Sequence, residues 1–161
     1  MGGSSSGPKK IGDVKQLIER AKEELRSRDE SNKKNVFISF AYEDIDDVNL
    51  LRGQAKNDKS PIEFNDWSVS EPFDSDRAPY IKQRIAERIA QSSLTVVYLS
   101  PHSARSKWVN WEVSESLRLG KRVIGVYSGS TTPSSVPSEI TKNRIKCVPW
   151  SGLAAAISQL G

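Results

Sequence analysis

The sequence contains few of the residues on which covalent cross-links and metal sites depend. Its 161 residues include one cysteine, Cys147, and one histidine, His102. A single cysteine excludes an intrachain disulfide and is typical of a protein that works in a reducing compartment. One cysteine and one histidine are also too few ligands for a structural zinc site. We therefore expect a cytoplasmic protein that holds no metal.

Long apolar runs and concentrated basic blocks are missing as well. No stretch approaches the roughly 20 apolar residues that a helix needs to cross a bilayer, and the N-terminus lacks the apolar centre of a signal peptide. The formal net charge is +4, with much of the surplus in the N-terminal region. Because no basic block is interleaved with aromatic residues, the charge favours solubility over nucleic-acid recognition. We expect neither a membrane nor a nucleic acid as a partner.

Composition divides the chain into three parts. Residues 1–8 (MGGSSSGP) are predicted to be a tag or a flexible leader. Residues 9–34 are predicted to form an amphipathic helix and a polar linker, because apolar residues recur at helical spacing from Ile11 to Leu25. We expect this helix to dock on the domain or to pair with another copy. Residues 35–161 are predicted to form the folded domain.

The folded domain alternates between predicted strands and predicted helices. The apolar, β-branched segments that predict strands are residues 35–40, 61–67, 94–99, 122–127 and 144–148. This alternation predicts an α/β domain, with a five-stranded, mostly parallel sheet and helices on both faces. A chain of this size favours the flavodoxin-like strand order 2-1-3-4-5, with a ligand crevice at the carboxyl ends of the first and third strands. Residues 128–139, rich in serine, threonine and proline, are predicted to be an irregular connection in place of a full helix.

The loops at the predicted crevice lack the motifs of several classes with this topology. The third strand runs into residues 98–101 (YLSP), without the aspartate that a receiver domain phosphorylates. The loop after the first strand, residues 40–44 (FAYED), is acidic, unlike the phosphate-binding loop of a flavodoxin. Neither G-x-G-x-x-G nor a P-loop is present. A Ser–His–acid triad is not convincing either, because the single histidine lies two residues past Ser100.

The candidate chemistry lies in residues 100–117 (SPHSARSKWVNWEVSESL). Trp108 and Glu112 are one helical turn apart and therefore share a face. Ser106 is predicted to cap this helix, which places Glu112 in the second turn, near the positive end of the helix dipole. We expect Glu112 to stay ionised there. Such a carboxylate could accept hydrogen bonds from two sugar hydroxyls and stabilise an oxocarbenium-like charge.

The surroundings of Glu112 allow more than one interpretation. Trp108 and Phe40 are predicted to stack on a flat leaving group. Alternatively, Glu112 is a solvated helix residue, and both Trp108 and Trp111 belong to the core. Glu115, one turn further along, is a rival carboxylate that we expect to lie farther from the loops.

Several segments together resemble TIR domains. Residues 35–44 (NVFISFAYED) resemble the opening strand and loop of that family, and residues 106–117 (SKWVNWEVSESL) resemble the tryptophan-x-x-x-glutamate helix of NAD-consuming TIR domains. Residues 71–72 (EP), 106–109 (SKWV), 111–112 (WE) and 120–126 (GKRVIGV) are more narrowly similar to the bacterial TIR-like proteins of Thoeris-type antiphage defence. The resemblance covers about residues 35–127 and extends more loosely to residue 161.

This resemblance implies an enzyme, an NAD+ glycohydrolase or ADP-ribosyl cyclase. It would cleave the nicotinamide–ribose bond of NAD, and ADP-ribose or a cyclic ADP-ribose isomer would serve as an immune signal. NAD is then the substrate, and no cofactor and no metal is implied. Glu112 would be the catalytic glutamate. The residues implied to bind substrate are Phe40, Ala41, Tyr42, Asp66, Ser100 and Trp108.

The resemblance also implies partners. TIR enzymes use neighbouring copies to complete the site, so we expect self-association, and a nucleotide signal would reach a downstream effector. Two segments depart from plant and animal TIR domains: residues 68–78 lack the usual glycine-containing pattern, and residues 128–139 replace the fourth helix. Two other functions remain open: a non-catalytic TIR-like interaction module, and a nucleoside-processing glycosidase related to deoxyribosyltransferases.

Overall fold

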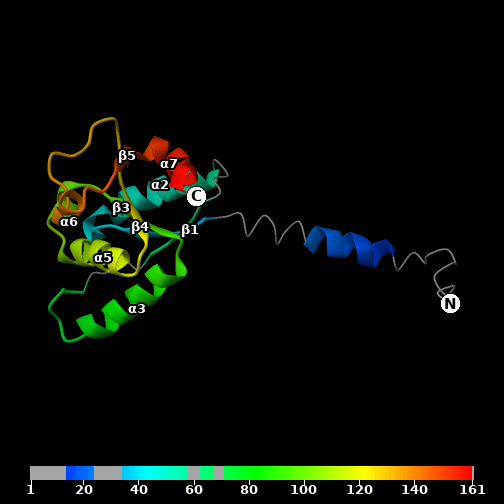
Figure 1. The fold of residues 1–161 in the computed structure, drawn as a ribbon, viewed down its shortest axis with the longest axis horizontal. Coiled ribbons are helices and arrows are strands. Elements are labelled where there is room, and N and C mark those ends of the chain that lie inside the picture. The colour runs from blue at the N-terminus through cyan, green and yellow to red at the C-terminus, as the bar shows by residue number, and fades with distance from the viewer. Residues whose placement is uncertain (1–13, 24–33, 58–61, 67–70, 161) are drawn as a thin grey trace. The chain divides into compact units, whose positions relative to one another are not determined.

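The computed structural model describes residues 14–23, 34–57, 62–66 and 71–160. Residues 1–33 and 34–161 form two separate units. In the first unit, residues 14–23 are helical (Figure 1). Its apolar residues Val14, Leu17 and Ile18 are 45–48% exposed. These helical residues fall within the segment 9–34 for which a helix and linker were predicted. The rest of that segment before Lys34 and the predicted leader, residues 1–8, lie outside the described residues.

The second unit is built on a five-stranded sheet in the order β2-β1-β3-β4-β5 (Figure 1). Every neighbouring pair of strands is parallel. The strands are β1 (Lys34–Ser39), β2 (Ile62–Asn65), β3 (Leu94–Tyr98), β4 (Arg122–Tyr127) and β5 (Cys147–Pro149). The predicted fold class and strand order are therefore confirmed. Parallel strands joined by crossovers need both faces of the sheet covered, which explains why β3 is buried along its whole length.

The helices differ from the sequence expectation at two places. The helical elements are η2 (Tyr42–Asp44), α2 (Ile45–Asn57), α3 (Ala78–Gln91), α4 (Pro101–Ala104), α5 (Lys107–Arg118), α6 (Ser138–Lys142), η3 (Trp150–Gly152) and α7 (Leu153–Leu160). The loop expected after β3 contains the short helix α4, which Ser100 and Ser103 stabilise by a reciprocal capping box. The irregular connection expected over residues 128–139 ends in the five-residue helix α6.

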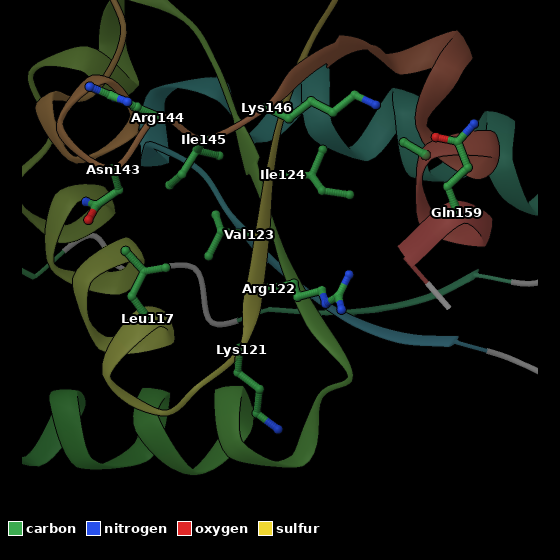
Figure 2. A pocket seen from close by; sticks show the side chains of 11 residues that line it. Leu117, Lys121, Arg122, Val123, Ile124, Asn143, Arg144, Ile145, Lys146 and Gln159 are labelled. Atoms are coloured by element: carbon green, nitrogen blue, oxygen red, sulfur yellow. The ribbon is translucent and has the colours of Figure 1, made fainter.

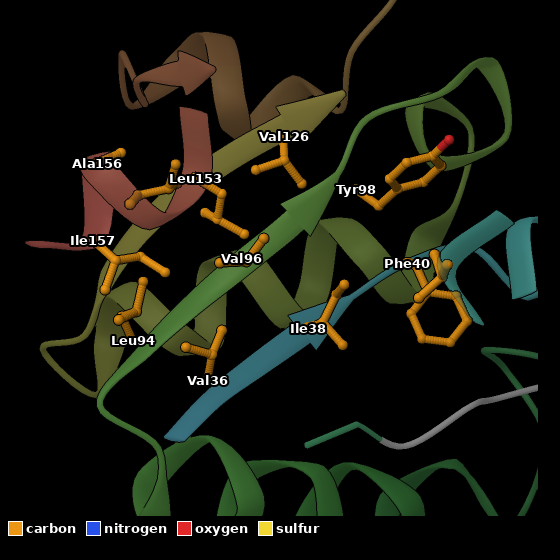
Figure 3. Close-up of a cluster of buried hydrophobic side chains, with 12 residues drawn as sticks. Val36, Ile38, Phe40, Leu94, Val96, Tyr98, Val126, Leu153, Ala156 and Ile157 are labelled. Carbon is orange, nitrogen blue, oxygen red and sulfur yellow. The ribbon is translucent and has the colours of Figure 1, made fainter. Parts of the chain in front are cut away.

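Helices cover the two faces of the sheet with different side chains. On one face, α2 and α7 pack on alternate residues of β1 and on β3 and β4 (Figure 3). This cluster includes Val36, Ile38, Phe40, Val48, Val96, Val126, Leu153 and Ile157. On the other face, α3 and α5 pack on Phe37, with Ile81, Ile85 and Trp108. Because successive strand residues point to opposite faces, Phe37 and Phe40 belong to different layers.

The carboxyl ends of the parallel strands bring polar residues to one edge of the sheet. Ser39 closes β1, Asp66 follows β2, and Ser100 follows β3 after Leu99. The second turn of α5 packs beneath the end of β1, because Glu112 is hydrogen-bonded to Ser39. This edge is the crevice position that the strand order predicts.

Candidate active site

Helix α5 is fixed at its start and along its buried face. The Ser106 side chain accepts a hydrogen bond from the Val109 N–H at 3.1 Å, as the sequence predicted for an N-cap. The Asn110 side-chain oxygen accepts from the Glu139 N–H at 3.2 Å and ties α5 to α6. The buried face of α5 consists of Trp108, Val109, Glu112, Val113 and Ser116. Glu112 therefore points into the protein, toward the end of β1.

Glu112 is a buried carboxyl group with one hydrogen-bonding partner on the sheet. Its side chain is 3% exposed, and its Oε1 is 2.6 Å from the Ser39 Oγ that donates to it. Burial raises the pKa of Glu112 to about 8, against the lowering effect of the Ser39 hydrogen bond, and the negative charge of Asp66 raises it further. The expectation that Glu112 stays ionised is therefore wrong for this arrangement. The loss of water around the carboxylate outweighs its place near the positive end of the helix.

The two tryptophans of α5 have different environments. Trp108 is 8% exposed and lies in the core, and its Nε1 donates a 2.7 Å hydrogen bond to the Glu71 carbonyl oxygen. Trp111 is half-buried and meets Trp108 edge-on, with ring centroids 6.1 Å apart. Phe73 also meets Trp108 edge-on, at 4.9 Å. The core interpretation is thus confirmed for Trp108, whereas the solvated interpretation of Glu112 is wrong.

Phe40 and Trp108 do not form the shared stacking surface that we expected. Phe40 is 9% exposed and packs in the cluster under α2 and α7, whereas Trp108 packs against α3 on the opposite face. The two rings therefore belong to different clusters of the core. The Arg52 guanidinium lies 5.9 Å from the Phe40 ring centroid, so a cation covers part of the Phe40 side.

The remaining residues implied by the resemblance lie along the carboxyl edge. Ala41 is buried, while Tyr42, in η2, is 48% exposed and presents its ring at the surface. Ser100 is buried and its hydroxyl donates to the Asp44 carboxylate. Burial raises the pKa of Asp44, and the hydrogen bond from Ser100 opposes this. The structure thus places Ser100 in a buried pair that the sequence analysis did not foresee.

Asp66 follows β2 and lies in a network of cations. Arg52 forms an ion pair with its carboxylate through Nη1, and Arg88 Nη1 donates to the Asp66 carbonyl oxygen at 3.3 Å. The negative charge of Asp66 raises the pKa of Glu112. Sequence reasoning missed both Arg52 and Ser39. The signal for Ser39 was available, since it is the polar residue inside the apolar segment 36–40 (VFISF).

Glu115 does not share the environment of Glu112. Arg118 donates to both of its carboxylate oxygens, at 2.6 and 2.7 Å. This pairing lowers the pKa of Glu115 and keeps it ionised beside the exposed Arg118, although the Glu115 side chain is itself only 12% exposed. The two carboxyl groups of α5 are therefore in opposite states at neutral pH, and the buried one faces the crevice.

The described part of the chain offers no obvious metal or membrane element. In residues 14–23, 34–57, 62–66 and 71–160, histidine, cysteine and carboxylate side chains do not gather in groups of three or more that could hold a metal ion. None of the helices in those ranges is long and apolar enough to span a bilayer.

Comparison with known proteins first defines the class. The TIR domain of the Toll-related receptor TRR-2 from Hydra magnipapillata superimposes with a TM-score of 0.53, covering 74% of this chain and 86% of that domain at 18% sequence identity. This likeness shows a TIR fold. Residues 37–133 match the family described as "Thoeris protein ThsB, TIR-like domain". The chain belongs to this family of TIR-like domains.

A relative with a name for its activity comes from Bacillus cereus (strain MSX-D12). That protein is named "Putative cyclic ADP-D-ribose synthase ThsB1" and is 29% identical over 98 residues, which cover 58% of this chain. The same alignment covers 51% of the relative, so this chain spans about half the length of the curated relative that it matches.

Proposed function

We propose that this TIR-like chain cleaves the nicotinamide–ribose bond of NAD, with Glu112 as the catalytic residue. The observation that carries the proposal is a carboxyl group, 3% exposed, that no cation in the described residues pairs with. Burying an unpaired acid destabilises a fold, and groups perturbed in this way gather at functional sites. The name of the Bacillus cereus relative, a cyclic ADP-D-ribose synthase, supports NAD as the substrate.

The proposed chemistry needs one negative charge close to the sugar. When the bond between ribose C1′ and the nicotinamide nitrogen breaks, its electron pair leaves with neutral nicotinamide and a positive charge develops on the ribose ring. Ionised Glu112 stabilises that charge. Addition of water to C1′ with release of a proton gives ADP-ribose. Addition of a nucleophilic atom from the other end of the same molecule gives a cyclic isomer, which the relative's name favours.

Access and ionisation both limit this chemistry in a single copy. Glu112 is covered in the described arrangement and holds a proton below about pH 8. The substrate-binding role of Phe40, Ala41, Tyr42, Asp66, Ser100 and Trp108 is part of this proposal. We further propose that a neighbouring copy completes the site in the cytoplasm and that the product acts on a downstream effector. The exposed ring of Tyr42, at the same edge, is available to such a copy.

The experiment is incubation of the chain with NAD at several protein concentrations, followed by chromatography and mass spectrometry. We expect nicotinamide release, with a rate per molecule of protein that rises with protein concentration. A product with the mass of NAD less nicotinamide indicates cyclisation, and a gain of water indicates hydrolysis. Deoxynucleosides are tested in parallel. Their cleavage in place of NAD would establish the glycosidase alternative, and no cleavage of either substrate at any concentration would favour the interaction module.

A further inference from the structure

We propose that a second site, on the opposite edge of the sheet from Glu112, binds a small molecule with two or more phosphate charges on a flat body, such as a nucleoside diphosphate. The site is a cavity of about 360 Å³ at the amino end of β4, within the size range of small-ligand pockets. Its lining comes from α5, β4, α7 and the segment between α6 and β5. These residues are Leu117, Lys121, Arg122, Val123, Ile124, Asn143, Arg144, Ile145, Lys146, Ala156 and Gln159.

Positive charge surrounds this cavity without a compensating acid. Lys121, Arg122, Arg144 and Lys146 line it, and no aspartate or glutamate does. Within the described residues, none of these four cations forms an ion pair with a carboxylate. Like charges gathered in this way repel one another, so an anion bound between them relieves that repulsion. The charge pattern therefore selects a ligand with several negative charges.

The floor of the cavity is an uncovered edge of β4. Backbone pairing between β4 and β5 starts at Gly125, whose N–H donates to the Lys146 carbonyl at 2.9 Å. The first three residues of β4, residues 122–124, pair with β3 on one side. On the other side β5 does not extend along them, because its pairing with β4 starts at Gly125. Figure 2 shows the apolar side chains of Val123, Ile124 and Ile145 in the middle of this floor. This apolar floor suits the flat body of a ligand.

The cations lie on both sides of that floor. In Figure 2, the side chains of Arg122, Lys146 and Gln159 lie on one side of the β4 ribbon, and those of Asn143 and Arg144 lie on the other. A ligand across the edge of β4 meets positive charge on either side. The amides of Asn143 and Gln159 add donors and acceptors for the polar groups of a base or sugar. A few polar groups around an apolar floor are typical of a small-molecule site, and an acidic protein segment would not need the enclosed floor.

Arg144 occupies a backbone position that normally favours glycine. It follows α6 with φ +52°, and its N–H donates to the Thr141 carbonyl while the Ile145 N–H donates to the Ile140 carbonyl. This is a Schellman C-cap, in which a left-handed residue after the helix is usually glycine. An arginine here costs stability relative to glycine. The strained position nevertheless carries a cation on the cavity wall, which supports a binding role.

The test is isothermal titration of the full chain with ADP, with inorganic pyrophosphate and adenosine as separate probes. We expect pyrophosphate to compete with ADP and adenosine to bind much more weakly than ADP. The variant Arg122→Gln/Lys146→Gln is expected to weaken ADP binding by at least about tenfold, because it removes two charge-assisted contacts. Lys142→Gln is the matched control, because Lys142 is exposed on α6 and does not line the cavity.

Arg144→Gly separates a binding role from a structural one. We expect it to weaken ADP binding by about tenfold and to raise the melting temperature by about 2–4 °C, because glycine adopts the left-handed conformation without strain. Lower thermal stability in Arg144→Gly would contradict the strain argument.

The proposal is overturned if ADP does not bind, if the cavity variants bind ADP like the unmodified chain, or if Lys142→Gln loses as much affinity as they do. The last result would indicate diffuse attraction to the positive surface.

Discussion

Replacing Glu112 with glutamine is expected to lower the rate of NAD cleavage by at least about a thousandfold, the scale of losing a group that stabilises transition-state charge. Glutamine has the same size and can keep a hydrogen bond to Ser39, which now lies 2.6 Å from the carboxyl oxygen. It cannot carry the negative charge that stabilises the ribose cation. Release of nicotinamide over time, measured at pH 8.5 on both proteins, gives the ratio directly.

The matched control for this substitution lies on the same helix. Glu115→Gln removes a carboxylate one turn further along α5, where the side chain is 12% exposed and paired with the exposed Arg118. We expect its rate to stay within about twofold of the unmodified chain, since glutamine keeps the size of Glu115 and an oxygen that accepts from Arg118, and the Glu112–Ser39 hydrogen bond is untouched. An equal loss in both variants would mean that the helix rather than Glu112 is needed. An active Glu112→Gln protein would remove Glu112 from the mechanism.

The same glutamine substitution is expected to make the fold more stable, and increasingly so as the pH rises. The pKa of Glu112 is about 8 in the folded chain against an ordinary value of 4.5. Between these values the unfolded chain releases the proton and the folded chain keeps it, so stability falls with rising pH and levels off above pH 8. The raised pKa of Glu112 lowers the free energy of unfolding by about 3 kcal/mol at pH 7 and by about 5 kcal/mol well above pH 8. Glutamine does not titrate, so the Glu112→Gln protein does not lose this stability.

Urea unfolding of the two proteins at pH 4.5, 7 and 8.5 measures this effect. We expect nearly equal unfolding free energies at pH 4.5 and a growing advantage for Glu112→Gln at the two higher values. A constant difference at all three would mean that the substitution acts through packing. A less stable Glu112→Gln at pH 8.5 would mean that the fold stabilises the ionised carboxylate, with the pKa of Glu112 below its ordinary value and not above it. A stabilised but inactive variant cannot owe its inactivity to unfolding, and it is the expected signature of a site that trades stability for activity.

The fold could be predicted from local sequence patterns because buried strands and buried helix faces each have a recognisable spacing of apolar residues. The run 94–98 (LTVVY) is buried on both sides, and the stripe of Ile81, Ile85 and Ile89 identifies the buried face of α3. The cap at Ser106 was equally local. Helix α4 was missed because four residues are too few for periodicity to show. Its signal was the pair Ser100 and Ser103, three residues apart.

The state of the candidate site could not be predicted in the same way. Glu112 depends on Ser39, which is 73 positions away in sequence, and burial by distant elements decides its pKa. The helix-dipole argument considered only α5 and therefore gave the wrong charge. The pairing of Phe40 with Trp108 was wrong for a related reason. Because side chains alternate between the two faces of a strand, Phe40 and Phe37 point to opposite faces of the sheet. Only the packing of the helices shows that Trp108 lies on the Phe37 face.

The most direct test of Glu112 as a buried, ionising catalytic group is the rate of NAD cleavage as a function of pH, from pH 6 to 9.5. With a pKa of about 8 for Glu112, the rate is expected to rise about tenfold per pH unit well below that value and to level off above it. Glu112→Gln should stay at background throughout. A rate that is constant through this range, or that falls as the pH passes 8, would contradict the account.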